Sequence, residues 1–198
     1  MTRILCLAIG YFCGCFLTAE VVARRRTGHG AAALGSGNPG MANIASTLGV
    51  KSGAAVLLGD VLKTALACGL CGLVLFPALG RTAVLYAGLG AVLGHNFPFW
   101  KRFKGGKGVA VTCAALVFFS PLGGVASGLL GLLAVVLTGY LPVGAVLIPA
   151  AAIIPVFWFY GAEHGLLVTA LTLIMLSRHY DGLLRAIHGQ EKQVWRGR

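Results

Sequence analysis

Residues 142–160 read PVGAVLIPAAAIIPVFWFY, a run of 19 residues without a charged side chain. A helix needs about 20 consecutive apolar residues to cross the hydrocarbon core of a bilayer, so this run predicts a membrane-spanning helix. Further apolar runs of the same character lie at residues 4–23, 54–76, 82–98, 108–120, 122–138 and 165–178. The sequence therefore predicts an all-α, polytopic membrane protein with about seven transmembrane helices.

Two of these runs, 108–120 and 165–178, are short for a span. The turn that begins at Pro121 could also join 108–120 to 122–138 as one kinked re-entrant element, so five spans is the alternative. No internal repeat or long linker divides the sequence. We therefore expect residues 1–198 to form a single helical integral-membrane domain.

Composition and charge narrow the classes of function. Hydrophobic residues make up 58% of the chain and charged residues only 11%, whereas soluble domains carry about 25% charged residues. The net charge is +11, but the cations stand between apolar runs rather than in basic arms with interleaved aromatic residues, which argues against nucleic acid. Anionic lipid head groups and anionic substrates are the expected partners.

The placement of the cations predicts the orientation in the membrane. With the N-terminus outside, 13 Lys and Arg fall on the predicted inner segments, and only Arg3 and Arg81 fall on outer ones. Positive charge marks cytoplasmic loops. The cluster Arg24–Arg26 follows the first apolar run instead of preceding it, the reverse of a signal peptide. We expect an external N-terminus, a retained first helix and a cytoplasmic C-terminus.

Several residues inside the apolar runs bear on packing. Small residues spaced four apart predict close contacts between helices, at Gly10/Gly14, Gly90/Gly94 and Gly124/Gly128. The six cysteines also lie in apolar runs. Only Cys68 and Cys71 have CxxC spacing, without a second pair or a nearby histidine, so we expect helix packing and no metal site.

Three ionisable residues, Glu20, Asp60 and Lys63, stand within the predicted spans. Such residues are functional candidates by default. Because Asp60 and Lys63 are three apart, they share a helix face. We expect them to form a structural ion pair.

The first of three polar segments on the predicted cytoplasmic side reads GSGNPGMANIAST, residues 35–47. Its glycines let backbone N–H groups turn together towards an anion, and its serine and asparagine side chains add donors. An ordinary flexible turn between spans is the alternative. We favour an anion-binding loop.

The second segment, residues 94–111, reads GHNFPFWKRFKGGKGVAV. It is not a Walker A motif, because that motif requires glycine at 101 and Ser or Thr at 108. Its glycines nevertheless can present N–H groups, the following helix offers its positive N-terminus, and lysines supply charge, which together suit phosphate. The alternative is a simple positive-inside anchor. For His95, packing at the helix end and a catalytic or binding role remain equal readings.

The third segment, residues 177–191, reads SRHYDGLLRAIHGQE. Arg178 and His179 emerge where the last predicted span leaves the membrane. Asp181 and Arg185 lie four apart, so on a helix they share a face and can pair. The alternative is an amphipathic tail that lies on acidic lipid.

Together the patterns SGNPGxxN, GHNFPxxxxFKGGKGVA and RHxxxxxRxxxGxE resemble the three signatures of the bacterial acyl-phosphate:glycerol-3-phosphate acyltransferases. The resemblance covers essentially the whole chain, in order and spacing. It implies a seven-helix bundle in the bacterial cytoplasmic membrane, with an active site facing the cytoplasm and no cofactor. It also implies transfer of an acyl group from acyl phosphate to the 1-hydroxyl of glycerol 3-phosphate. The products would be lysophosphatidic acid and inorganic phosphate, in the first step of phospholipid synthesis.

The resemblance further implies roles for individual residues. Those expected to bind the substrate phosphates are Ser36, Asn38, Gly40, Asn43, Gly105, Gly106, Lys107, Gly108, Arg178 and Asp181. The catalytic candidates are His179, His95 and Lys104. Because acyl phosphate is already activated, no covalent enzyme intermediate is required. The proton of the acceptor hydroxyl could be taken by His179, by His95 or by an oxygen of a substrate phosphate.

Two positions depart from the family pattern. The family usually has a basic residue where this chain has Ser46, and asparagine where it has Asp181. Together they move the local charge by about −2, and one unit charge about 4 Å from a phosphate is worth roughly 4 kcal/mol at an effective dielectric constant of about 20. A divergent acyltransferase with a less anionic acceptor is therefore one alternative. A membrane carrier or sensor for an organic phosphate is the other, although the internal repeats typical of carriers are not visible.

Overall fold

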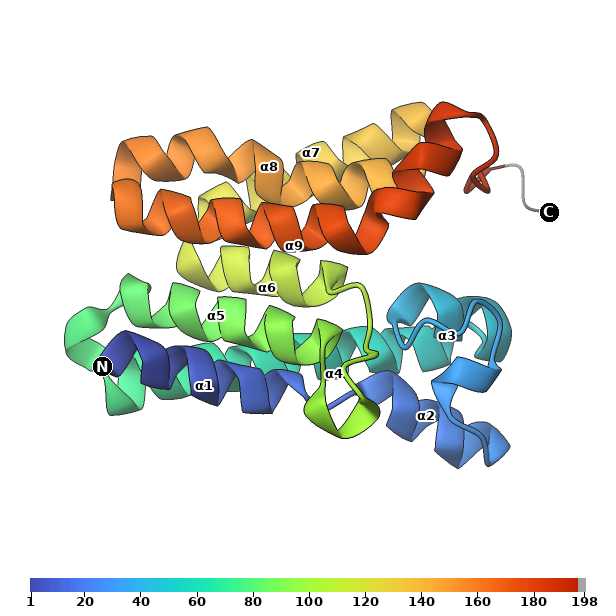
Figure 1. Cartoon of the computed structure of the whole chain (residues 1–198), viewed down its shortest axis with the longest axis horizontal. Coiled ribbons are helices and arrows are strands. Elements are labelled where there is room, and N and C mark those ends of the chain that lie inside the picture. Colours follow the sequence, from blue (N-terminus) through green and yellow to red (C-terminus); the bar gives the residue numbers. More distant parts are fainter. Residues whose placement is uncertain (196–198) are drawn as a thin grey trace. The chain divides into compact units, whose positions relative to one another are not determined.

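The computed structural model describes residues 1–195, and within that range the backbone forms helices without a β-strand (Figure 1). The prediction of an all-α protein is confirmed. Contacts divide the chain into two compact units, Met1–Ala115 and Leu116–Arg198. Each unit is described by itself below.

Unit 1 contains five complete α-helices and the start of a sixth. These are α1 (Thr2–Gly14), α2 (Thr18–Thr27), α3 (Met41–Leu48), α4 (Val50–Gly69), α5 (Arg81–Asn96) and α6 (Val109–Phe119). The shorter elements are η1 (Ala31–Ala33), the π-helical η2 (Leu70–Leu75) that extends α4, η3 (Pro77–Leu79) and η4 (Phe99–Lys101). Unit 2 continues from α6 with α7 (Pro121–Thr138), α8 (Leu141–Tyr160) and α9 (Ala162–Ile187).

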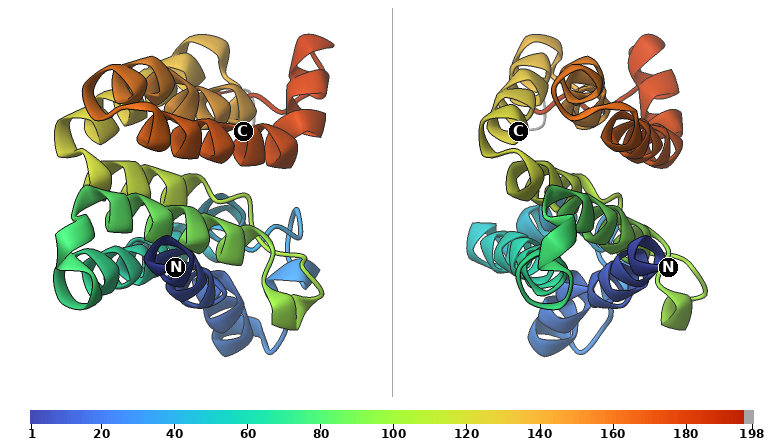
Figure 2. Two further views of the ribbon diagram at one scale, coloured as in Figure 1. Left: turned by 60° about the vertical axis from the view of Figure 1, so that its left-hand side comes forward. Right: turned by 90° about the vertical axis from the view of Figure 1, so that its left-hand side faces the viewer.

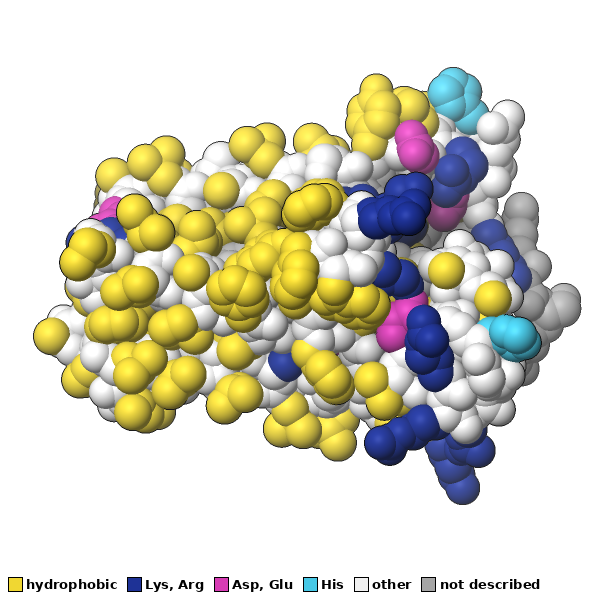
Figure 3. Space-filling model, turned by 60° about the horizontal axis from the view of Figure 1, so that its bottom comes forward, with side chains coloured by type: hydrophobic (Ala, Val, Ile, Leu, Met, Phe, Trp, Pro, Cys, Tyr) yellow, Lys and Arg dark blue, Asp and Glu magenta, His cyan; other side chains and the backbone are white. Residues whose placement is uncertain are grey.

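Four helical stretches within residues 1–195 are long and apolar enough to cross a membrane: Thr2–Thr27, Val50–Leu75, Pro121–Thr138 and Leu141–Tyr160. The other three predicted spans coincide with α5, α6 and α9. Large apolar side chains such as Leu122, Ile154 and Trp158 are exposed on the helices, and hydrophobic side chains cover most of the face in Figure 3. Such a surface suits lipid as its solvent.

The packing of α1 on α5 depends on the predicted small residues. Gly10 and Gly14 of α1 face the backbone of α5, and Gly90 and Gly94 of α5 face the backbone of α1. A Cβ atom on Gly10 would overlap the carbonyl of Ala87. The two helices run side by side in the same direction (Figure 1), and the predicted close contact at these two glycine pairs is confirmed.

The third predicted glycine pair makes the expected close contact at only one of its two members. Gly124 packs against the backbone at the end of α6, and a Cβ atom on Gly128 would meet nothing within 4 Å. Instead, α7 approaches α8 where Gly131 and Gly144 face each other. The prediction is confirmed for Gly124 and was wrong for Gly128, because spacing alone does not fix which face of a helix meets its neighbour.

The first predicted span, 4–23, is interrupted between α1 and α2, and α2 leaves in a new direction (Figure 2). The break frees backbone carbonyls that a continuous helix would satisfy. Trp100 Nε1 donates to Cys15 O at 2.8 Å, and Lys63 Nζ donates to Phe16 O at 2.8 Å. Side chains from distant parts of the chain therefore stabilise a break that the local sequence did not predict.

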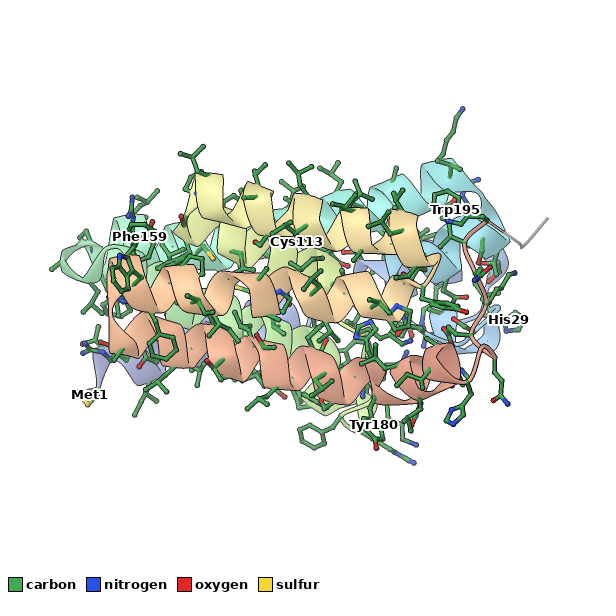
Figure 4. All side chains as sticks on the ribbon, turned by 90° about the horizontal axis from the view of Figure 1, so that it is seen from above. Met1, His29, Cys113, Phe159, Tyr180 and Trp195 are labelled. Atoms are coloured by element: carbon green, nitrogen blue, oxygen red, sulfur yellow. The ribbon has the colours of Figure 1, made fainter. Side chains whose placement is uncertain are left out.

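The ends of each unit are marked in Figure 4. Met1 and His29 lie at opposite ends of unit 1, and Phe159 and Trp195 lie at opposite ends of unit 2. The segment after α2, which leads into the first polar loop, thus lies at the end of unit 1 remote from the N-terminus.

Candidate active site

The first polar segment is organised by Asn43, at the start of α3. Its buried side chain accepts a hydrogen bond from Ser36 N at 2.9 Å and donates to Leu34 O at 2.9 Å and Asn38 O at 3.0 Å. A Cβ atom on Gly35 would overlap the Asn43 amide oxygen. The Asn43 amide therefore shapes the turn, while Ser36 is exposed and Asn38 and Gly40 are half-buried.

In the second segment, the residues of GHN and GGKG pack against each other as one unit. Gly105 N donates to Asn96 O and Gly106 N donates to His95 O, each at 3.0 Å. A Cβ atom on Gly106 would overlap the ring of His95, and one on Gly108 (φ +81°) would lie 2.6 Å from Asn96 Oδ1. The glycines are thus needed because they let the loop approach His95 and Asn96 closely. The sequence had suggested a different reason, the presentation of backbone N–H groups to an anion.

This packing changes which donors the segment offers to an anion. The N–H groups of Gly105 and Gly106 were expected to point towards a phosphate, but both are bonded to backbone carbonyls. The first N–H groups of a helix have no intrahelical acceptor, so those at the start of α6 can serve instead. Lys104 adds charge, because its side chain is exposed and forms no ion pair within the described residues.

The loop that carries Lys104 has an unusual backbone. Arg102 and Phe103, neither of them glycine, adopt consecutive left-handed conformations with φ of 51° and 60°. Phe103 N donates to Pro98 O at 3.1 Å, which closes the turn. Such conformations persist where surrounding contacts enforce them, and they concentrate at functional sites.

Glu20, buried on α2, connects the two polar segments of unit 1. Its carboxylate forms ion pairs with Lys101 and with Arg24 and accepts a hydrogen bond from Ala31 N at 3.2 Å. Burial lowers the pKa of the Lys101 ammonium, whereas the nearby carboxylate favours its charged form. Glu20 therefore joins η4 of the second segment to the stretch that leads into the first.

The predicted ion pair between Asp60 and Lys63 is confirmed, with Nζ 2.8 Å from Oδ1. The structure adds a third member, because Lys63 Nζ also lies 2.8 Å from His95 Nδ1. An ammonium has donors and no acceptor, so Nδ1 accepts and the neutral ring carries its proton on Nε2. His95 therefore does not present the tautomer that a base acting through Nε2 requires.

In unit 2, the third segment continues α9 as regular helix to Ile187. His179 is buried, and its Nδ1 lies 3.0 Å from Met175 O. Because a carbonyl only accepts, Nδ1 donates in this contact, and in the neutral ring Nε2 is then the acceptor nitrogen. Arg178 is half-buried and Asp181 is exposed.

Asp181 and Arg185 can pair across one helix face, but the structure does not form this pair. Arg185 Nε instead lies 2.6 Å from Glu191 Oε2, in the segment after α9. Asp181 has no ion pair within the range that the structure covers.

Sequence reasoning also assigned no role to two polar residues, Asn96 within the second segment and Thr112 directly after it. Both are completely buried, and in the described part of the chain neither the Asn96 amide nor the Thr112 hydroxyl has a hydrogen-bond partner. An unsatisfied buried polar group costs about 1–3 kcal/mol. The asparagine of GHN, directly against Gly108, was the available signal.

Comparisons with known proteins extend over the same segments. Residues 4–189 match the family described as glycerol-3-phosphate acyltransferase. The chain belongs to this family. The proteins named glycerol-3-phosphate acyltransferase 1 from Lactobacillus johnsonii and glycerol-3-phosphate acyltransferase from Alkaliphilus metalliredigens are each 37% identical to it. The alignments cover 98% and 99% of this chain, and 93% and 98% of the relatives.

Solved structures give the same assignment for the fold. Two crystal structures of PlsY (YgiH), an integral membrane glycerol 3-phosphate acyltransferase, superpose with TM-scores of 0.85 and 0.84 at 26% and 25% identity. They cover 98% of this chain and represent the glycerol 3-phosphate form and the lysophosphatidic acid form of that protein. The chain is thus an acyltransferase and a membrane protein, and the resemblance noted in the sequence is confirmed.

Proposed function

We propose that the chain transfers an acyl group from acyl phosphate to the 1-hydroxyl of glycerol 3-phosphate, producing lysophosphatidic acid and inorganic phosphate. The observation that supports this most is the family match over residues 4–189, which includes the first two polar segments and all but the last two residues of the third. The names of the solved PlsY forms agree with this acceptor and this product.

The chemistry requires little of the protein beyond positioning and charge stabilisation. The hydroxyl oxygen attacks the acyl carbonyl carbon, the bond from that carbon to the bridging oxygen breaks, and phosphate leaves with the electron pair. Developing negative charge is stabilised by fixed donors and cations. The exposed ammonium of Lys104 and the positive N-terminus of α6 are suited to this task.

Of His95 and His179, His179 is the better candidate for the base that takes the proton of the acceptor hydroxyl. With Nδ1–H donated to Met175 O, its Nε2 is the unprotonated nitrogen. Arg178, the preceding residue on α9, supplies a cation for a phosphate group. In the first segment, exposed Ser36 and half-buried Asn38 offer hydrogen-bonding groups, on a turn held by Asn43.

The remaining features of the proposal concern the membrane. The chain crosses the bacterial cytoplasmic membrane seven times as one domain, with its N-terminus outside and its active site on the cytoplasmic side. The cation distribution of the sequence supports this orientation. So does the common direction of α1 and α5, which the first and third of seven spans require.

A second candidate is the same acyl transfer to a less anionic acceptor. It is favoured by the exposed carboxylate of Asp181, which forms no ion pair with another described residue, and by Ser46, whose hydroxyl donates to Asn43 O at 2.9 Å. Neither position carries the residue that is usual in the family. The double variant Ser46→Arg with Asp181→Asn should then gain activity with glycerol 3-phosphate, and an unchanged rate would rule out charge as the explanation.

The proposed reaction is tested with purified protein in lipid nanodiscs, supplied with palmitoyl phosphate and glycerol 3-phosphate. We expect lysophosphatidic acid and inorganic phosphate in equal amounts, and no product when palmitoyl-CoA replaces palmitoyl phosphate. Absence of product from both donors would contradict the proposal. Product from palmitoyl-CoA alone would contradict the proposed donor.

A further inference from the structure

The second polar segment rests on a buried group of ionisable side chains outside the substrate-binding residues named above. Lys63 Nζ lies 2.8 Å from each of three acceptors, Asp60 Oδ1, His95 Nδ1 and Phe16 O. Two of these contacts, to His95 Nδ1 and Phe16 O, are hydrogen bonds, and the contact with Asp60 is an ion pair. The three side chains are at most 6% exposed.

The contact with Lys63 fixes the orientation of the His95 ring. Because Nδ1 accepts from the lysine, the opposite edge of the ring, with Nε2, faces Gly106. Any Cβ atom at position 106 would overlap this edge of the ring. The ring therefore sets how close the loop can approach the end of α5.

The backbone of His95 and Asn96 also holds the loop. The carbonyls of His95 and Asn96 accept hydrogen bonds from Gly106 N and Gly105 N, both at 3.0 Å. Rotation of the His95 ring, or movement of its backbone, would therefore disturb both glycines. The network also reaches the break between α1 and α2 through Phe16 O.

We propose that Asp60, Lys63 and His95 form a positioning network that holds residues 104–108 in the shape that binds a substrate phosphate. The inference rests on the proposed function for the identity of the substrates. None of the three side chains needs to contact substrate: Lys63 orients His95, Asp60 neutralises Lys63, and His95 supports the glycine loop. His95 is then a positioning residue and not the base.

Ion pairs of this kind also occur as purely structural elements, so the test must separate loop position from stability. The double variant Asp60→Asn with Lys63→Met removes both charges together, and so leaves no single buried charge. Thr64→Ala is the matched control, because Thr64 is buried on the same helix and its hydroxyl donates only to Asp60 O, within α4.

The first readout is hydrogen exchange of the amides of Gly105 and Gly106, measured on the full chain in nanodiscs. We expect exchange at least tenfold faster in the double variant and unchanged exchange in Thr64→Ala. This readout needs no catalytic activity. If the wild-type protein showed no acyl transfer, the proposed function would fail while the exchange result would still decide the inference.

The second readout is steady-state kinetics. We expect the KM of at least one phosphate substrate to rise tenfold or more, with kcat within threefold of the wild-type value. Unchanged exchange and unchanged KM in a folded double variant would overturn the proposal. If that variant does not fold, Gly106→Ala tests the same contact from the loop side. It should give the same rise in KM, and an unchanged KM would count equally against the network.

Discussion

Two buried histidines in this protein use their Nδ1 atoms in opposite ways. His95, at the end of α5, is 3% exposed and accepts from Lys63, whereas His179, on α9, is 4% exposed and donates to Met175 O in its own helix. The difference decides which ring nitrogen carries the proton. Equal burial therefore accompanies different proposed roles, which are loop support for His95 and proton transfer for His179.

The two histidines also differ in how far along the chain their hydrogen-bond partners lie. Met175 is four residues from His179, a contact that any helix provides. Lys63 is 32 residues from His95 and belongs to another helix. The hydrogen bond of His179 Nδ1 thus lies within one helix, whereas that of His95 depends on the packing of α4 against α5.

The largest expected effect comes from His179→Asn, which removes Nε2 and retains an N–H donor near the position of Nδ1. We expect kcat to fall by about 100-fold or more, since general base catalysis contributes roughly 10²–10⁴-fold. His188→Asn is the matched control, because His188 Nδ1 makes the same type of contact, 2.8 Å from Leu184 O, at an exposed position. If kcat were equal in both variants, His179 would not be the base.

A smaller effect is expected from Gly105→Ala, where the new Cβ atom would overlap His95 O and crowd Pro98. We expect KM for a phosphate substrate to rise several-fold, and overpacking to lower the free energy of unfolding by about 1–3 kcal/mol. Gly69→Ala is the control, since a Cβ atom at Gly69 meets nothing within 4 Å. Equal KM values for the two variants would show that the loop tolerates displacement.

Glu20→Gln tests whether the two polar segments of unit 1 depend on their shared carboxylate. Because Lys101 is 22% exposed at its side chain, we expect a loss of about 1–3 kcal/mol in unfolding free energy, less than for a fully buried pair. Glu191→Gln, which breaks the more exposed pair with Arg185, should cost less than about 1 kcal/mol. Thermal unfolding of both variants in nanodiscs measures the difference, and the reverse order would contradict the role of Glu20.

The smallest expected effect is that of Asp181→Asn. Removing an exposed negative charge should lower KM for glycerol 3-phosphate by roughly twofold to fivefold at low ionic strength. Because solvent ions screen exposed charges, the gain should disappear in about 1 M salt. A gain that persists at high salt would indicate a contact other than electrostatic attraction.

Much of the fold could be predicted because it depends on local sequence. Six of the seven apolar runs coincide with a helical stretch, and the first is divided between α1 and α2. The close approach of α1 and α5 follows from Gly10/Gly14 and Gly90/Gly94, and the Asp60–Lys63 pair follows from helical spacing. The polar segments and the family were also accessible, since the second motif is long and specific.

The features that sequence reasoning missed depend on contacts between distant residues. The break at 15–17 is stabilised by Trp100 and Lys63, and Arg185 takes Glu191 as its partner instead of the closer Asp181. The N–H groups of Gly105 and Gly106 bond to carbonyls that only the folded turn brings near. Residue spacing describes one helix or one loop at a time, so it does not reveal such partners.

The pH dependence of kcat in two variants tests the account most directly. A base must be unprotonated to act, so kcat of the wild-type protein should fall as the pH is lowered. We predict that His95→Asn keeps this fall at the same midpoint, because Asn Oδ1 can still accept from Lys63, and that His179→Asn gives a low, pH-independent kcat. A profile that is flat in His95→Asn and unchanged in His179→Asn would contradict the assignment of the two histidines.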